Sequence, residues 1–299
     1  MVTAHLDTSG IDHARRLIAA ASAADGVAPL SEQSVRAIAD SADDPDAVLH
    51  VVSPAGYANI LRGRDGEPAM IEAVVDPAAR RRGYGRALLE SAFTAARALP
   101  GAVENPPRAW AHGDLPAARA LASAIGVRPR RELLQLRREV GADGADLAPL
   151  DDTAPGAVVR TYASASDDAE ILRVNNAAFA WHPEQGGWDL AQIRERVESD
   201  WFDPAGLFLA FDAADPTRLL GFHWTKRHSA DLGEVYIVGV DPAAQGRGLG
   251  HTLTLAGLHY FAERGVGTVM LYVEGDNSSA LRTYDRLGFT RYAVDVAYG

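Results

Sequence analysis

The chain has 299 residues, of which 47% are hydrophobic, and its formal net charge at pH 7 is -11. This length suits about two domains, each with an ordinary hydrophobic core. The chain contains no cysteine, which excludes disulfides, thiolate nucleophiles and cysteine-based metal sites, and we expect no metal. The acidic charge disfavours a nucleic-acid partner, because phosphate backbones require a basic face.

The hydrophobic residues are distributed in short runs. No apolar stretch reaches the length of about 18 residues that a transmembrane helix needs. The first residues also lack the basic and apolar regions of a secretory signal. We therefore expect a monomeric cytoplasmic protein with no membrane partner.

The first half of the chain begins with helical patterns and continues with strand patterns that lead into a glycine-rich turn. Its predicted helices span residues 11–24, 31–42, 85–99 and 115–125. Its predicted strands span residues 47–52, 57–62, 68–75, 109–112 and 132–138.

Residues 141–156 are rich in Gly, Ala, Asp and Pro with little apolar periodicity, which predicts a linker. The second half then repeats the plan of the first. Its predicted helices span residues 169–178, 190–198, 250–264 and 278–287. Its predicted strands span residues 206–212, 218–225, 232–240, 268–273 and 290–296. Each half, 1–140 and 157–299, is therefore predicted to be an α/β domain with a mixed sheet.

One phrase occurs in both halves. Residues 75–85 read VDPAARRRGYG and residues 240–250 read VDPAAQGRGLG, each between a predicted strand and a predicted helix. Such a turn directs backbone N–H groups and the positive end of the helix dipole at one point, which predicts two phosphate cradles. Basic residues gather in the first copy, which favours a small polyanion as ligand. They are Arg80, Arg81, Arg82 and Arg86.

Two common phosphate motifs do not fit these turns. Neither copy ends in the Lys-Ser/Thr pair of a Walker A loop, and Leu88 and Leu253 stand where a dinucleotide fingerprint requires its third glycine. A glycine-rich turn that binds nothing is the remaining alternative.

The pattern Q/R-x-x-G-x-G resembles the acetyl-CoA loop of the GCN5-related N-acetyltransferase superfamily. Residues 276–289, DNSSALRTYDRLGF, also match the N-x-x-A-x-x-x-Y-x-x-x-G-F helix of that superfamily. The resemblance implies acetyl-CoA as co-substrate, with its pantetheine arm on a strand that splays from its neighbour and its pyrophosphate on the loop amides. Asn277 or Ser278 can cap the helix, and Ala280 permits close approach of the cofactor. Tyr284 would protonate the departing thiolate, the alternative being a tyrosine of the core.

Glu234 is the candidate general base. It lies in an otherwise apolar strand, where a carboxylate carries a desolvation cost that a functional site tolerates better than a core. An amine nucleophile arrives as ammonium and must lose a proton before attack, and Glu234 can accept that proton directly or through a water. A solvent-facing glutamate on a sheet surface is the alternative.

The repeat allows the two halves to be compared. The offset of 165 residues between the two turns places Ala69 where the second half has Glu234, and alignment of Gly126 with Gly288 places Ala122 where it has Tyr284. The first domain is therefore predicted to bind acetyl-CoA and to be catalytically silent.

Several longer phrases resemble the mycothiol synthase family of actinobacteria. They are residues 114–119 (DLPAAR), 182–188 (HPEQGGW), 221–226 (GFHWTK) and 233–236 (GEVY). The resemblance implies acetyl transfer from acetyl-CoA to the cysteinyl amine of a cysteinyl-glucosaminyl-inositol. It also implies catalysis by Glu234 and Tyr284 in the C-terminal domain.

The same resemblance implies a set of binding residues. Glu32, Glu184, Lys226, Glu234 and Tyr272 would line the substrate pocket. Coenzyme A would be held in the second domain by Val238, Gly239, Val240, Gln245, Gly246, Arg247, Gly248, Leu249, Gly250, His251, Asn277, Ser278, Ser279, Ala280, Leu281 and Arg282. A second coenzyme A would be held in the first domain by Ala73, Val74, Val75, Arg81, Arg82, Gly83, Tyr84, Gly85 and Arg86.

Some of these roles have structural alternatives. Glu32 could be an ordinary helix start, and Lys226 could be a solvated charge at a strand end. Trp188 lies with Glu184 in a glycine-rich loop, where we expect function rather than packing. The first turn also has Arg80 where the superfamily has Gln, which Arg could replace electrostatically.

Two other functions remain open from the sequence. One is another duplicated N-acetyltransferase acting on an aminoglycoside, a polyamine or a peptide amine, and the other is a non-enzymatic acetyl-CoA sensor. The absence of cysteine fits direct attack of the amine on the thioester in a ternary complex, and it excludes a cysteinyl acyl-enzyme.

Overall fold

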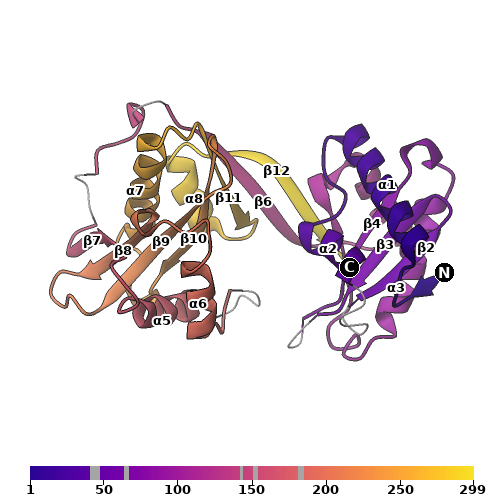
Figure 1. Ribbon diagram of the computed structural model, residues 1–299, viewed down its shortest axis with the longest axis horizontal. Coiled ribbons are helices and arrows are strands. Elements are labelled where there is room, and N and C mark those ends of the chain that lie inside the picture. Colours follow the sequence, from indigo (N-terminus) through magenta and orange to yellow (C-terminus); the bar gives the residue numbers. More distant parts are fainter. Residues whose placement is uncertain (41–47, 64–66, 142–143, 151–153, 181–184) are drawn as a thin grey trace. The chain divides into compact units, whose positions relative to one another are not determined.

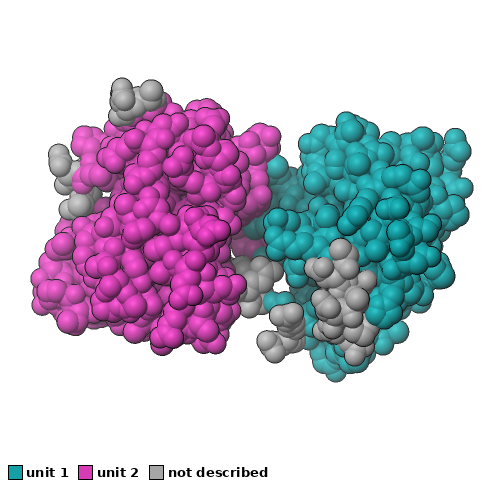
Figure 2. Space-filling model, in the orientation of Figure 1, with its two compact units in different colours: residues 1–133, 293–299 teal, residues 134–292 magenta. Residues whose placement is uncertain are grey.

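A computed structural model describes residues 1–299 except 41–47, 64–66, 142–143, 151–153 and 181–184. The chain forms two compact units (Figure 2). Unit 1 comprises residues 1–133 and 293–299, and unit 2 comprises residues 134–292. In the part of the chain that the structure describes, no helix combines the length and apolar character that crossing a bilayer requires.

Unit 1 contains a mixed sheet with the strand order β1-β2-β3-β4-β5-β12 (Figure 1). Neighbouring strands are antiparallel except β4 and β5, which are parallel. The strands wholly within this unit are β1 (Val2–Thr3), β2 (Val48–Ser53), β3 (Gly56–Leu61), β4 (Met70–Val75) and β5 (Arg108–Ala111). The helices are α1 (Thr8–Asp25), α2 (Glu32–Asp40), α3 (Tyr84–Arg97) and α4 (Pro116–Ile125), with short 3-10 turns η1 (Pro77–Ala79) and η2 (His112–Asp114).

Unit 2 contains strands in the order β6-β11-β10-β9-β8-β7, in which β10 and β11 are parallel and β7 to β10 are antiparallel. The strands are β6 (Pro129–Glu139), whose first residues belong to unit 1, β7 (Ala157–Thr161), β8 (Leu207–Asp212), β9 (Leu219–Arg227), β10 (Leu232–Val240) and β11 (Thr268–Glu274). The helices are α5 (Asp168–Ala178), α6 (Leu190–Val197), α7 (Leu249–Glu263) and α8 (Ser278–Arg286), with 3-10 turns η4 (Pro204–Gly206) and η5 (Pro242–Ala244). The predicted α/β class with a mixed sheet in each half is confirmed. The short strands β1 and β7 were not predicted.

The last strand, β12 (Thr290–Tyr298), begins in unit 2 and ends in unit 1. Its final residues pair with β5, with Val296 opposite Ala111 and Tyr298 opposite Ala109. The predicted domain ranges, 1–140 and 157–299, follow chain order, whereas the compact units do not. Pairing between strands so far apart in the chain leaves no local pattern in a sequence.

Helix ends follow local capping chemistry. The Asp7 side chain accepts a hydrogen bond from the Gly10 N–H at 2.8 Å, so α1 begins at Thr8, before the predicted start at residue 11. Gly26 ends α1 with φ 70°, a left-handed conformation that glycine adopts without steric cost.

Helices cover both faces of the unit 2 sheet. On one face, Leu253 of α7 packs against Leu220 of β9. On the other face, Ile171 of α5 packs with Phe222 and Trp224 of β9. Leu220 and Phe222 serve different cores although they are two residues apart, because the register between β8 and β9 shifts at Leu220 and interrupts the alternation of side chains between faces.

A buried ion triad connects β12 to the neighbouring elements of unit 1. His112 Nδ1 lies 3.1 Å from Asp295 Oδ2, and His112 Nε2 lies 3.5 Å from Glu72 Oε1. The Ser31 N–H donates to Glu72 at 2.6 Å, and the Gly113 N–H donates to Asp295 at 2.8 Å. Although burial opposes it, the hydrogen bond to Asp295 and the nearby carboxylate of Glu72 raise the pKa of His112 to about 9. Burial also opposes ionisation of both carboxyls, but His112 holds the pKa of Glu72 and of Asp295 below their usual values.

The raised pKa of His112 predicts a loss of stability at alkaline pH. The contribution of His112 to the free energy of unfolding is complete below about pH 6.5, the ordinary pKa of histidine. It is lost as pH rises through about 9, the raised pKa of His112. Between pH 7 and pH 10, unit 1 of the wild type should lose about 2–3 kcal/mol more unfolding free energy than unit 1 of His112→Gln.

Urea unfolding followed by fluorine NMR of 5-fluorotryptophan measures this difference, because Trp110 is the one tryptophan of unit 1. His13→Gln, a change on α1, serves as the control and should keep the wild-type pH dependence. Equal losses in the wild type and in His112→Gln would show that the triad does not stabilise unit 1 through charge.

Candidate active site

Strands β10 and β11 separate after a short paired segment. Leu232 lies opposite Thr268 and Glu234 lies opposite Met270, where the pairing with β11 ends. On its other side β10 stays paired with β9 as far as Val240. The backbone groups of β10 that point away from β9 beyond Glu234 therefore have no strand partner among the described residues, and the opening implied by the resemblance is present.

Unit 1 has a similar opening. Strand β4 pairs with β5 only where Met70 lies opposite Arg108 and Ile71 lies opposite Ala109, and β4 then continues to Val75. The two units thus share the separation of parallel strands as well as the repeated turn.

The turn after β10 has the conformation of an anion cradle. Gly246 and Gly248 have φ angles of 78° and 83°, a region that favours glycine. The first backbone hydrogen bond of α7 runs from Thr252 N to Gly248 O, so the amides before it have no intrahelical acceptor. A Cβ added at Gly250 would meet no atom within 4 Å. Open space and unpaired amides at a helix start suit a phosphate group.

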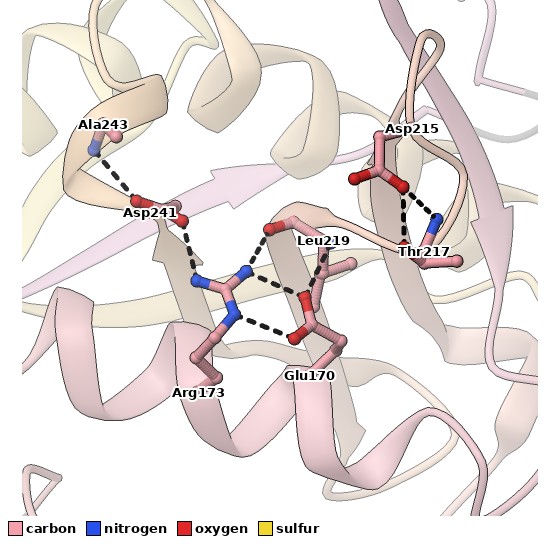
Figure 3. A network of polar contacts seen from close by, with 7 residues as sticks. All are labelled: Glu170, Arg173, Asp215, Thr217, Leu219, Asp241 and Ala243. Carbon is pink, nitrogen blue, oxygen red and sulfur yellow. Dashed lines mark hydrogen bonds and ion pairs between the residues drawn. The ribbon is translucent and has the colours of Figure 1, made fainter.

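A network of charged groups holds the start of this turn (Figure 3). The Asp241 side chain accepts the Ala243 N–H at 2.9 Å and caps η5. Arg173 of α5 donates to Asp241 at 2.8 Å, to Glu170 at 2.8 Å and to the Leu219 carbonyl at 2.7 Å. Although burial opposes it, Arg173 holds the pKa of Asp241 below its usual value. Sequence reasoning missed Arg173, because no motif connects α5 with a turn so far along the chain.

The turn of unit 1 repeats the backbone with different side-chain contacts. The Arg80 guanidinium donates to both carboxylate oxygens of Asp25 at 2.7 Å, so its charge is already paired. Arg81 has φ 65°, close to the φ of 78° at Gly246 in unit 2. Arg81 and Arg82 are exposed. We expected the charge of Arg80 to take the place of the superfamily Gln in binding a phosphate. Asp25 neutralises that charge and so weakens the expectation.

Glu234 lies in a row of side chains on one face of the unit 2 sheet. It is opposite Lys226 of β9 and opposite Met270 of β11, and opposed residues of adjacent strands share a face. Its side chain is 12% exposed, and its Oε2 lies 2.7 Å from His228 Nε2. Sequence reasoning did not select His228, whose position next to Glu234 depends on the register of the β9–β10 hairpin.

Lys226 lies among aromatic rings rather than in open solvent. Its ammonium is 4.9 Å from the ring centre of Trp201 and 5.4 Å from that of Tyr236, within the range of cation–π attraction. Arg196 of α6 donates to the Tyr236 hydroxyl at 3.2 Å. These aromatic residues were not selected from the sequence, where a Trp or Tyr is indistinguishable from a core residue.

Tyr284 lies on α8, which begins where the Asn277 side chain accepts the Ala280 N–H, so one of the two predicted caps is confirmed. The side chain is half-buried and its ring meets Phe289 edge-on. Burial raises the pKa of Tyr284 to about 12, so the phenol stays protonated near neutral pH. Its hydroxyl has no hydrogen-bond partner among the described residues. Tyr284 can therefore donate a proton to a bound group.

Of the three other residues predicted to bind the substrate, the structure describes Tyr272 and Glu32. Tyr272 of β11 is 47% exposed, and Gln135 donates to its hydroxyl at 2.6 Å. Glu32 of α2 lies in unit 1, where it is exposed and pairs with Arg36 at 3.1 Å. Glu184 lies outside the described residues.

Trp188 packs in the core, in contrast to the functional role that we expected from its loop. It is 6% exposed, and the Arg196 guanidinium lies 3.8 Å from its ring centre. Asn176 donates to its carbonyl and accepts its N–H. The glycine-rich sequence around Trp188 therefore gave no indication that this side chain is buried in the core.

A β-bulge in β10 corrects the comparison of the two halves. Lys226 lies opposite Glu234, whereas its equivalent in the repeat, Leu61, lies opposite Met70. The extra residue of the bulge shifts the register by one, so the counterpart of Glu234 in unit 1 is Met70 and not Ala69. Methionine has no ionisable proton acceptor either.

The predicted equivalence of Ala122 and Tyr284 agrees with the backbone hydrogen bonds after the two helices. After α4, the Val127 N–H donates to Ala122 O, and after α8 the Phe289 N–H donates to Tyr284 O. Ala122 and Tyr284 therefore occupy equivalent positions at the ends of equivalent helices, and unit 1 has no phenol there.

The chain matches a family model described as "Acetyltransferase (GNAT) family" over residues 22–124 and 173–289. Among curated proteins, it is 63% identical to "Mycothiol acetyltransferase" of Gordonia bronchialis, over 100% of this chain and 94% of that protein. It is 53% identical to "Mycothiol acetyltransferase" of Nocardia farcinica, over 99% of this chain and 96% of that protein.

Solved structures show the same fold. A GCN5-related N-acetyltransferase from Sphaerobacter thermophilus superposes with a TM-score of 0.72 at 22% identity, over 100% of this chain and 94% of that chain. A tandem GNAT protein from the clavulanic acid biosynthesis pathway superposes with a TM-score of 0.65 at 20% identity, over 99% of this chain and 95% of that chain. The predicted tandem arrangement of two such folds is confirmed. Within the described ranges, no group of three or more His, Asp or Glu side chains could hold a metal ion.

The network around Arg173 predicts that its removal loosens the turn. Arg173→Met deprives Asp241 and Glu170 of their cation and should lower the unfolding free energy of unit 2 by about 1–3 kcal/mol. Urea unfolding followed by tryptophan fluorescence measures this change. Arg194→Met, at an exposed position of α6, is the matched control and should change stability by less than about 0.5 kcal/mol. Equal effects of the two variants would contradict a structural role of the network.

Proposed function

The chain belongs to the acetyltransferase (GNAT) family and is an acetyl-transferring enzyme, and we propose that it catalyses the reaction for which its mycothiol acetyltransferase relatives are named. The acetyl group of acetyl-CoA passes to the cysteinyl amine of 1D-myo-inositol 2-(L-cysteinylamino)-2-deoxy-α-D-glucopyranoside, which is the last step of mycothiol biosynthesis. We further propose that the enzyme acts as a cytoplasmic monomer on this small molecule, without nucleic-acid or membrane partners.

The position of Glu234 carries this proposal. It is the last residue of β10 that pairs with β11, so its carboxylate lies where the two strands begin to separate. An acyl group delivered along the open side of β10 would meet this carboxylate first. Full-length similarity to proteins named for this reaction supports the choice of acceptor.

The residues around the opening fit acetyl-CoA, which supplies an acetyl group activated as a thioester. Free backbone groups of β10 suit the amides of a pantetheine arm, and the amides before Thr252 suit a pyrophosphate. The open space beside Gly250 leaves room for the pyrophosphate. The residues that would hold acetyl-CoA are Val238, Gly239, Val240, Gln245, Gly246, Arg247, Gly248, Leu249, Gly250, His251, Asn277, Ser278, Ser279, Ala280, Leu281 and Arg282.

Glu234 acts as the general base. The cysteinyl amine is an α-amino group with an ordinary pKa of about 8, so most of it is protonated at neutral pH. Glu234, 12% exposed and negatively charged, attracts the ammonium and accepts its proton directly or through a water. The amine then attacks the thioester carbon without a covalent enzyme intermediate.

Tyr284 acts as the general acid. Its half-buried phenol keeps its proton at neutral pH and lacks another partner among the described residues, so it can donate to the departing thiolate. Lys226 and Tyr272 contribute to the acceptor pocket, and Glu184 and Glu32 are further substrate-binding residues that the family resemblance implies. Of these, Lys226 and Tyr272 lie on strands that flank Glu234.

Unit 1 holds a second acetyl-CoA without catalysing transfer. Its strands separate in the same way and its turn keeps the same backbone, which supports binding. Met70 and Ala122 stand at the positions of Glu234 and Tyr284, so neither proton transfer has a carrier there. The binding residues would be Ala73, Val74, Val75, Arg81, Arg82, Gly83, Tyr84, Gly85 and Arg86.

Mass spectrometry of the products tests the proposed reaction. Purified protein with acetyl-CoA and the cysteinyl pseudodisaccharide should form the N-acetylated product together with free coenzyme A. A panel of aminoglycosides, polyamines and peptides should be acetylated far more slowly. Robust activity on panel members alone would favour another N-acetyltransferase, and binding of acetyl-CoA without any acetylation would favour a sensor.

Glu234→Gln should lower kcat on the order of 10²-fold, because it removes the base while keeping the shape of the side chain. The Kd of acetyl-CoA should stay within about twofold of the wild type, since Glu234 is proposed to touch the amine and not the coenzyme. Steady-state kinetics and calorimetry measure the two quantities. Tyr292→Gln, at an exposed site on β12, is a control for adding an amide and should leave kcat unchanged. An unchanged kcat in Glu234→Gln would refute the assigned base.

Glycine substitutions in the two turns decide which unit catalyses. Gly250→Ala places a methyl group in the open cradle of unit 2 and should lower turnover at least about tenfold, because it crowds the coenzyme. The equivalent Gly85→Ala in unit 1 should leave turnover within about twofold and reduce the number of acetyl-CoA molecules bound, as measured by calorimetry. Loss of activity from Gly85→Ala, with Gly250→Ala fully active, would reverse the assignment.

A further inference from the structure

The carboxylate of Glu234 has one close side-chain partner among the described residues. His228 Nε2 lies 2.7 Å from Glu234 Oε2, a hydrogen-bond distance. The Glu234 side chain is 12% exposed, whereas that of His228 is 33% exposed. The pair therefore extends from the interior of the site to solvent.

The β9–β10 hairpin brings these two residues together. Lys226 is directly opposite Glu234, and the His228 N–H donates to Leu232 O across the hairpin. His228 is thus the diagonal neighbour of Glu234, two residues beyond Lys226. Residues two apart on a strand share a face, so the imidazole and the carboxylate meet on the side of the sheet that carries the proposed acceptor site.

Other charged groups nearby have different partners. Lys226 of β9 lies over the rings of Trp201 and Tyr236 and forms no ion pair with Glu234. Arg196 of α6 donates to the Tyr236 hydroxyl. Asp231, at the hairpin turn, accepts the Gly267 N–H, and Glu139 of β6 accepts from Thr268 of β11. Among the described titratable groups, His228 is therefore the one that can exchange a proton with Glu234.

The chemistry of the proposed function releases a proton in every cycle. An ammonium and an acetyl thioester become an amide and a thiol, and one proton must leave for solvent. The ammonium proton passes to Glu234. The second proton that nitrogen loses as the amide forms balances the one that the thiolate takes from Tyr284. A largely buried base that kept the first proton could not accept another in the next cycle.

We propose that His228 relays the ammonium proton from Glu234 to solvent and so resets the base after each turnover. Nε2 accepts the proton from the carboxyl group, and the exposed imidazole passes a proton to water or buffer. His228 acts through Glu234 and touches neither the acyl group nor the coenzyme. This inference rests on the proposed function of Glu234 as the base.

Replacement of the imidazole tests the relay. His228→Ala should lower kcat about tenfold with the KM for the acceptor within about twofold, because binding survives while deprotonation slows. Added imidazole should restore kcat in a saturable way, with the effect growing as pH rises and more of the added imidazole is neutral. His228→Gln, which can hydrogen-bond but cannot carry a proton, should show the same loss of kcat.

The outcomes separate a relay from a structural contact. His259→Gln removes an imidazole of unit 2 that binds the Ala148 carbonyl, and it should keep wild-type kinetics with or without imidazole. Wild-type kcat in His228→Gln would overturn the relay, because a hydrogen bond alone would then suffice. A raised KM with unchanged kcat, or a loss of kcat that imidazole does not restore, would overturn it too.

A spectroscopic measurement keeps this inference separate from the identity of the acceptor. In nitrogen-15 NMR at fixed pH, the His228 Nε2 signal should move in Glu234→Gln and stay in place in Tyr292→Gln. An unmoved signal would overturn the coupling whatever amine the enzyme acetylates. If the pseudodisaccharide is not acetylated, the proposed reaction fails, and the kinetic tests of His228 are run with the amine that the substrate panel identifies.

Discussion

The end of pairing between β10 and β11 is the constraint on which the site depends. Two parallel strands that stayed paired would satisfy each other's backbone groups and leave nothing to bind a ligand. Because pairing ends at Glu234, the same point in the fold has unpaired backbone beside a carboxylate. We propose that the backbone receives the acyl donor and that the carboxylate receives the amine. The turn that follows β10 then adds helix-start amides, and Asp241, paired with Arg173, caps the 3-10 turn η5 that precedes them.

The two units show how a shared backbone can carry different chemistry. Both have strands that separate, a turn in the left-handed region and a helix after it. Unit 2 adds a carboxylate, a bulge and a phenol, whereas unit 1 has Met70 and Ala122 at the corresponding positions. Unit 1 instead buries Glu72 with His112 and Asp295, where the three charges stabilise the end of β12 within its sheet.

Much of the fold could be predicted because its signals are local. Hydrophobic periodicity located most helices and strands, and the repeated phrase located both glycine-rich turns before α3 and α7. Glu234 and Tyr284 could be proposed from the sequence because one is a charge in an apolar strand and the other lies in a recognisable helix motif. His228 and Arg173 were not found, since their partners lie across a hairpin or on another element. Trp188 was misassigned because a glycine-rich loop gives no sign of burial.

The amino-acid sequence by itself determined the α/β class, the duplication, the two glycine-rich turns and the residues proposed for proton transfer. Each of these depends on the order of residues within a short segment. Only the tertiary structure decided the register that aligns Glu234 with Met70, the contact between His228 and Glu234, and the pairing of β12 with β5. The physical reason is that strand register and long-range pairing arise from hydrogen bonds and packing between segments distant in the chain.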